Sequence, residues 1–165
     1  MIVKQSVFGN LKRVSGRLLS LLGRHNEPAH EERPMPRLLV VDDEESICFS
    51  MGEYFSLHGY KVDTAREIEE VVKLIESTDY EVIIQDLRLG PARNPDGLNI
   101  IKLAHTRNPE TRIIVLTAYG SAEMEDQARQ CGASAFLRKP KPLSQVAQVV
   151  QGLIESPAKH SAKPA

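Results

Sequence analysis

Five side chains capable of chemistry closely follow short apolar runs in the middle of the chain. They combine carboxylates, which bind divalent cations or act as nucleophiles, with a hydroxyl and an ammonium group, which can hold an anion. These residues are Asp42, Asp43, Asp86, Thr117 and Lys139. Two like unit charges about 4 Å apart repel by about 4 kcal/mol at an effective dielectric of about 20, so gathered carboxylates need a proton or a cation. Oxygen ligands in a partly hydrated cleft favour Mg²⁺.

The elements that must position these residues follow from the hydrophobic periodicity of the chain. We expect strands at 38–41, 60–64, 81–84, 112–116 and 135–137. We expect helices at 45–57, 67–77, 98–106, 122–130 and 143–154. Gly59 and Gly132 lie where two of these helices should stop. Regular alternation of strand and helix predicts an α/β fold, a doubly wound five-stranded parallel sheet with helices on both faces.

The predicted sheet determines where the reactive side chains meet. In an open doubly wound sheet, ligands bind at the carboxyl ends of the strands, near the point where the strand order reverses. With the order 2-1-3-4-5, the first and third strands are neighbours. Asp42, Asp43 and Asp86 are then expected within a few ångströms of one another at one rim, with Thr117 and Lys139 on the next strands.

Four segments carry a family resemblance. Leu38-Leu-Val-Val-Asp-Asp-Glu44, Gln85-Asp-Leu87, Leu116-Thr-Ala118 and Arg138-Lys-Pro140 resemble the receiver domain of bacterial response regulators, which has a flavodoxin-like fold, over about residues 37–156. The resemblance implies that Asp86 accepts a phosphoryl group from a histidine kinase or a phosphotransfer protein. It also implies a stand-alone, chemotaxis-regulator-like module that switches the binding of a downstream protein through its helix 4 to helix 5 face.

The same resemblance implies a role for each site residue. Mg²⁺ would be bound by Asp42, Asp43, Asp86 and the backbone carbonyl of Arg88. Lys139 and the Thr117 hydroxyl would stabilise the phosphoryl group. Thr117 and Phe136 would form the switch that changes the docking surface. No catalytic turnover is implied beyond Mg²⁺-dependent self-phosphorylation and slow self-dephosphorylation at Asp86.

This sequence departs from the family pattern in three places. The loop between Asp86 and Asp96-Gly97 is longer than family members usually show. Arg88 and Tyr119 occupy the variable positions that tune the access of water to the acyl phosphate, and a bulky Tyr119 is expected to slow hydrolysis. Phe136 stands where many relatives have tyrosine, so no partner can recognise a hydroxyl there.

Several alternatives stay open. Taken singly, the acidic run could cap a helix, Thr117 could cap the next one, and Lys139-Pro140 could be a surface turn. An aspartyl-phosphate hydrolase would need a second acid where Arg88 stands, and a flavin or nucleotide carrier would need a glycine-rich loop after the first strand. The main alternative function is a phosphorylation-independent pseudo-receiver that acts as a protein-interaction module.

Charge separates the predicted domain from its flanks. Residues 37–156 hold thirteen Lys and Arg against nineteen Asp and Glu, which argues against nucleic-acid binding by this part. Residues 1–36 form a basic extension and linker, and 157–165 a tail expected to be disordered, with no second domain after it. We prefer to interpret the basic stretch as an upstream extension, with translation starting at Met35. Contact of residues 1–24 with a membrane surface and a short coiled coil are the alternatives.

The cysteine pattern and the hydropathy of the chain indicate the cellular compartment in which the protein is expected. The chain has two cysteines, Cys48 and Cys131, and they are far apart in the sequence, which is not the pattern of a disulfide-stapled secreted protein. No apolar run approaches the roughly 20 residues of a transmembrane helix. We therefore expect a cytoplasmic protein.

Overall fold

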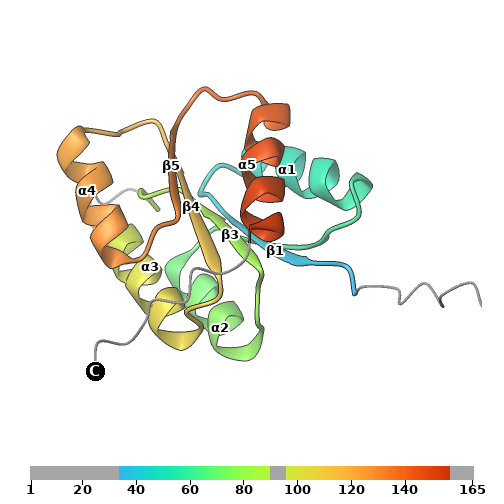
Figure 1. Ribbon diagram of the computed structural model, residues 1–165, viewed down its shortest axis with the longest axis horizontal. Helices are drawn as coiled ribbons and strands as arrows, with labels where there is room; N and C mark the ends of the chain where they lie inside the picture. Colours follow the sequence, from blue (N-terminus) through green and yellow to red (C-terminus); the bar gives the residue numbers. More distant parts are fainter. Residues whose placement is uncertain (1–33, 90–95, 157–165) are drawn as a thin grey trace, which may run out of the picture. The chain divides into compact units, whose positions relative to one another are not determined.

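The computed structural model describes residues 34–89 and 96–156, in which strands and helices alternate (Figure 1). The strands are β1 (Arg37–Val41), β2 (Lys61–Ala65), β3 (Val82–Gln85), β4 (Arg112–Thr117) and β5 (Ala135–Arg138). The helices are α1 (Glu45–Leu57), α2 (Ile68–Ser77), α3 (Asp96–Arg107), α4 (Ala122–Cys131) and α5 (Leu143–Glu155). All strand pairs are parallel, in the order β2-β1-β3-β4-β5. The predicted fold class and strand order are confirmed.

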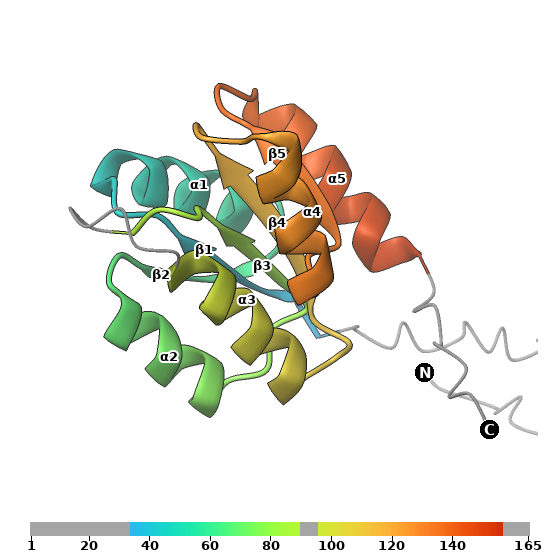
Figure 2. The ribbon, with the colours of Figure 1, turned by 90° about the vertical axis from the view of Figure 1, so that its left-hand side faces the viewer.

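Helices cover both faces of the sheet, as the two views show (Figure 1 and Figure 2). Successive strand residues point to opposite faces. In β1, for example, Leu39 and Val41 pack in the core under α2, α3 and α4, whereas Leu38 and Val40 pack in the core under α1 and α5. Burial of each such side chain contributes about 1.5–3 kcal/mol. The sheet that carries the site is therefore packed between helices on both faces.

Local signals start and stop the helices. The Ser121 hydroxyl accepts a hydrogen bond of 3.1 Å from the Met124 N–H and begins α4. Gly132, with φ of 115°, ends α4, and Gly59, with φ of 85°, follows the end of α1. Both are left-handed conformations that glycine adopts without steric cost. The two helix ends predicted at glycines are confirmed.

Two strands lie one residue later than predicted. β2 spans Lys61–Ala65 rather than 60–64 because the Tyr60 N–H donates to the Phe55 carbonyl and belongs to the turn after α1. β3 spans Val82–Gln85 rather than 81–84, with Gln85 paired to Val41. Asp42 and Asp86 therefore each follow directly on the last paired residue of adjacent strands.

Three of the segments interpreted from the sequence lie outside the described residues. The basic stretch with its membrane-surface and coiled-coil alternatives, the longer loop at 90–95 and the tail at 157–165 all lie there. Among the described residues, none of the helices has the length and apolar character needed to cross a bilayer.

Candidate functional site

The candidate site lies where β1, β3, β4 and β5 end. The Asp86 N–H donates to the Val41 carbonyl (2.9 Å), which extends the β1–β3 ladder to the first residue beyond β3. The Lys139 N–H donates to the Thr117 carbonyl (2.9 Å) in the same way beyond β5. Sheet hydrogen bonds thus fix the backbone from which each reactive side chain projects.

One ammonium group joins two carboxylates at this rim. Lys139 Nζ lies 2.5 Å from Asp42 Oδ2 and 2.8 Å from Asp86 Oδ2. The Oδ1 atoms of these acids accept the N–H groups of Glu44 and Arg88, each at 3.1 Å. The side chains of Asp42, Asp86 and Lys139 are 4%, 9% and 14% exposed. Each carboxylate is therefore held by one side-chain and one backbone donor, and its orientation is fixed.

Burial and pairing act in opposite directions on this cluster. Burial raises the pKa of Asp42, and the hydrogen bond from Lys139 only partly offsets this. The pKa of Lys139 is also raised: burial by itself would lower it, but the two carboxylates outweigh burial. The ionised cluster of two acids and one ammonium carries a net charge of −1, so it can still attract a cation.

The predicted gathering of three acids is not observed. The Asp43 side chain is exposed, and residues 34–89 and 96–156 contain no group of three His, Cys, Asp or Glu placed to hold a metal. The structure instead brings together two acids, and the Lys139 ammonium compensates the charges of this Asp42 and Asp86 pair. The donor chemistry nevertheless fits Mg²⁺, which prefers oxygen ligands, takes one or two carboxylates and keeps several waters.

The predicted switch residues lie on β4 and β5. Thr117 is fully buried, and its Oγ1 accepts the Tyr119 N–H at 3.3 Å, so it does not cap α4. Phe136 is half-buried and packs against the core on the α3 and α4 side. A Cβ atom on Gly120 would lie 2.8 Å from Cε1 of this ring. The loop after Thr117 is therefore in direct contact with the aromatic ring.

The two predicted tuning residues contact each other. The Arg88 guanidinium carbon lies 3.4 Å from the centroid of the Tyr119 ring, a cation–π arrangement. The Tyr119 side chain is otherwise open to solvent, with 58% of the residue exposed. The pair connects the loops that follow β3 and β4.

Two further residues support the site, and sequence reasoning missed their contacts. Gln85 is fully buried, and its Nε2 donates to the Gly97 carbonyl at 2.8 Å, which ties the end of β3 to the first turn of α3. The Cys48 thiol donates to the Asp42 carbonyl at 3.2 Å, and the residue also packs in the core. An amide in an otherwise apolar strand was the available signal for Gln85. Nothing in the sequence marked the contact of Cys48.

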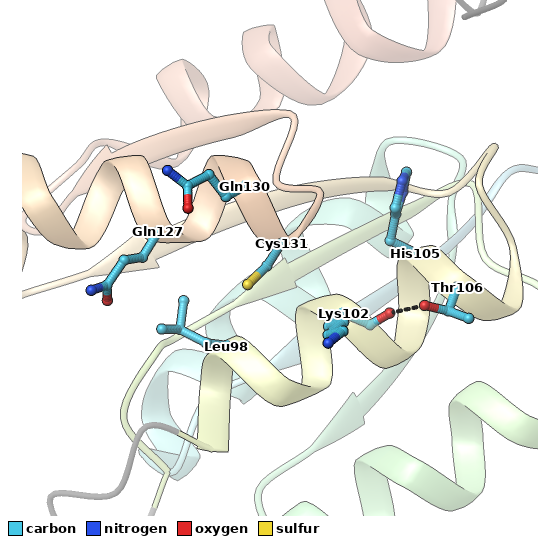
Figure 3. A pocket seen from close by; sticks show the side chains of 7 residues that line it. All are labelled: Leu98, Lys102, His105, Thr106, Gln127, Gln130 and Cys131. Carbon is cyan, nitrogen blue, oxygen red and sulfur yellow. Dashed lines mark hydrogen bonds between the residues drawn. The ribbon is translucent and has the colours of Figure 1, made fainter. Parts of the chain in front are cut away.

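Two hollows lie outside the pair of acids, and Lys139 lines one of them. One, of about 510 Å³, opens beside Lys139 between the first turns of α1, the end of β4 and residues 139–143. The other, of about 430 Å³, lies between α3 and α4, as Figure 3 shows. It is lined by Leu98, Lys102, His105, Thr106, Gln127, Gln130 and Cys131. Only the first adjoins a strand-end residue of the site.

Comparisons with known proteins agree with this geometry. The family model described as the response regulator receiver domain matches residues 38–151. The response regulator protein PilR of Pseudomonas aeruginosa is 33% identical, over 69% of this chain and 25% of that protein. The chain likewise spans about a quarter of the regulatory protein AtoC of Escherichia coli and 63% of RegA of Cereibacter sphaeroides.

Solved structures share the fold. A response regulator from Burkholderia pseudomallei, solved with a phosphorylated aspartic acid, a calcium ion and citrate, has a TM-score of 0.66 and 31% identity. That match covers 72% of this chain and 68% of the other. The beryllofluoride-activated NtrC4 receiver domain dimer has a TM-score of 0.65 and 34% identity, over 72% of this chain and 96% of the other.

Proposed function

The chain belongs to the response regulator receiver domain family, and from this premise we propose that Asp86 is the phosphoacceptor of a phosphorylation-switched binding module. The observation that carries the proposal is the ammonium of Lys139, 2.8 Å from Asp86 Oδ2 and shared with Asp42. A buried carboxylate at a strand end, with a cation beside it, suits in-line attack on a phosphoryl group. The proposed donor is a histidine kinase or a phosphotransfer protein.

The proposed reaction moves one phosphoryl group. A carboxylate oxygen of Asp86 forms a bond to phosphorus while the bond from phosphorus to the donor's histidine nitrogen breaks, and that nitrogen keeps the electron pair. Lys139 turns from the carboxylates toward the phosphoryl oxygens and neutralises their charge. Asp42, Asp43, Asp86 and the backbone carbonyl of Arg88 are the groups that would hold Mg²⁺, and a bound Mg²⁺ would supply further positive charge beside the phosphoryl group. The product is an acyl phosphate on Asp86.

Contacts at the end of β4 support a route from this phosphate to the surface. The Thr117 hydroxyl would turn toward the phosphoryl group and draw the loop after β4 inward. Gly120 in that loop touches the Phe136 ring, so movement of the loop changes the space available to the ring. We propose that the surface of α4, β5 and α5 responds and that a downstream protein binds there.

The proposal describes a binding switch rather than an enzyme with turnover. Arg88 occupies the position where an aspartyl-phosphate hydrolase would place a second acid. Its guanidinium lies on the ring of Tyr119 in the resting protein, and we expect the bulky Tyr119 beside the acyl phosphate to restrict the access of water. Self-phosphorylation with Mg²⁺ and slow self-dephosphorylation are the activities we expect.

The proposed unit spans residues 37–156, flanked by the basic extension at 1–36 and the tail at 157–165. Both cysteines are free thiols, as expected of a protein in a reducing compartment, and we propose a cytoplasmic location. We propose no nucleic-acid contact by this acidic unit.

Intact-mass measurement after incubation with acetyl phosphate tests the phosphoacceptor. With Mg²⁺ present, the wild type and the control Asp126→Asn, which changes an exposed acid on α4, should each gain one phosphoryl adduct. Asp86→Asn should gain none, and omission of Mg²⁺ should reduce the adduct on every protein. An adduct on Asp86→Asn, or none on the folded wild type, would contradict the proposal. The second result would favour the phosphorylation-independent interaction module instead.

A further inference from the structure

The contact between Arg88 and Tyr119 is tied at both ends to the proposed phosphoryl site. The Arg88 N–H donates to Asp86 Oδ1 at 3.1 Å, so the backbone of this arginine is anchored on the phosphoacceptor itself. The Tyr119 N–H donates to the Thr117 hydroxyl at 3.3 Å. Their side chains meet with the guanidinium carbon 3.4 Å from the ring centroid. The Arg88–Tyr119 pair therefore connects Asp86 to the Thr117 hydroxyl. This connection is separate from the direct contact proposed between that hydroxyl and the phosphoryl group.

The guanidinium has a weak partner in the resting protein. In the part of the chain that the structure describes, Arg88 forms no salt bridge with an acid, and its contact is the π face of Tyr119. A cation–π contact at an exposed ring is weaker than a charge-assisted, bidentate hydrogen bond from arginine to phosphate. A phosphoryl group two residues away along an anchored backbone would therefore compete well for the same cation.

We propose that Arg88 and Tyr119 form a latch that opens on phosphorylation. The inference rests on the proposed function of Asp86. In the resting state the guanidinium lies on the Tyr119 ring, and in the phosphorylated state it leaves the ring and binds the phosphoryl oxygens. The exchange involves no covalent step. Its result is a free, exposed aromatic side chain at the mouth of the site, in the loop that leads to α4.

The latch makes a prediction that a steric role for Tyr119 does not make. Because the ring and the phosphoryl group compete for one guanidinium, removal of the ring should strengthen phosphoryl binding only while Arg88 is present. A bulky residue that merely blocked the site would instead act in the same way whatever stands at position 88. A double-mutant cycle separates the two roles.

The experiment measures the apparent Kd of the full chain for beryllofluoride, a phosphoryl analogue, in saturating Mg²⁺. Four proteins are compared: wild type, Arg88→Gln, Tyr119→Leu and the double variant. Arg88→Gln should weaken binding about tenfold through loss of a charge-assisted hydrogen bond. Tyr119→Leu should tighten binding about two- to fivefold, the value of an exposed cation–π contact. In the Arg88→Gln background, Tyr119→Leu should change nothing.

A nuclear magnetic resonance measurement provides a second readout that does not depend on affinity. The ring should shift the side-chain Nε–H signal of Arg88 upfield in the free wild type, and beryllofluoride should abolish this shift. The shift should be absent from Tyr119→Leu. Equal effects of Tyr119→Leu in both backgrounds, or an unchanged upfield shift in the bound wild type, would overturn the latch and leave the phosphoacceptor standing. Failure of the folded wild type to bind beryllofluoride would overturn both.

Discussion

At the scale of single residues, Lys139 holds the two buried acids of the site together. Its ammonium lies between Asp42 and Asp86, two carboxylates that would otherwise repel each other in a largely buried setting. Even so, burial leaves the pKa of Asp42 raised. The charged form of Asp42 therefore lowers the stability of the folded protein.

This cost predicts a pH dependence for Asp42→Asn in Mg²⁺-free buffer. An acid whose pKa is raised on folding contributes stability below its unfolded pKa and loses it as the pH rises through the folded value. Asparagine stays neutral throughout. The free energy of unfolding of Asp42→Asn, relative to wild type, should therefore increase between about pH 4, near the ordinary pKa of aspartate, and about pH 7.

Urea unfolding at both pH values measures the difference. Asp43→Asn is the matched control, because it makes the same change at the next residue, where the side chain is exposed. The free energy of unfolding of Asp42→Asn relative to wild type could instead stay constant or decrease with pH. That result would contradict the conclusion that burial disfavours the charged form of Asp42.

At the scale of elements, helix ends determine how α4 is placed. Gly132 combines a left-handed φ of 115° with close contact to α3, where an added Cβ would lie 2.5 Å from Cγ of His105. Gly152 in α5 has no such constraint, because an added Cβ meets nothing within 4 Å. The fold therefore requires glycine at position 132 but not at position 152.

Alanine substitution should separate these two glycines. Gly132→Ala should lower the free energy of unfolding by about 1–3 kcal/mol through backbone strain and the clash with His105. Gly152→Ala, in an open helical position, should raise it by about 0.5–1 kcal/mol because alanine loses less entropy on folding. Urea denaturation of both variants at one pH checks the prediction, which equal effects of the same sign would contradict.

At the scale of the whole molecule, the site couples ligand binding to global stability. Its residues come from the ends of four strands of one sheet, and the helices on both faces hold that sheet together. A cation that needs groups from the ends of both β1 and β3 binds only the folded chain. Its binding free energy is therefore added to the stability of the whole domain.

Mg²⁺ should accordingly stabilise the folded protein. At a concentration of 100 times Kd the free energy of unfolding should rise by about 2.7 kcal/mol, and a chelator should reverse the rise. Thermal or urea unfolding with and without Mg²⁺ measures it. The rise should be lost or much reduced in Asp43→Asn and Asp86→Asn but kept in Asp126→Asn. Equal stabilisation of all four proteins would indicate non-specific binding and contradict the proposed ligands.

Much of the fold could be predicted because its signals are local. Period-2 and period-3.6 patterns repeat within a few residues, and the alternation of strands and helices permits few topologies. Asp42, Asp86 and Lys139 could be placed on one rim because parallel strands end at the same edge. Strand boundaries were less accurate, since contacts that the hydrophobic pattern does not show decide them: the turn hydrogen bond from Tyr60 to Phe55, and the pairing of Gln85 with Val41 on another strand.

The sequence by itself thus determined the element order, the sheet and the edge at which the reactive residues lie. Only the tertiary structure decided which of them touch: Lys139 between two acids, Asp43 exposed, Arg88 on the ring of Tyr119, and Gln85 on Gly97. The physical reason is that residue spacing places a side chain on a face or at a strand end. Its rotamer and its partner depend on charges and space supplied by segments far away in the chain.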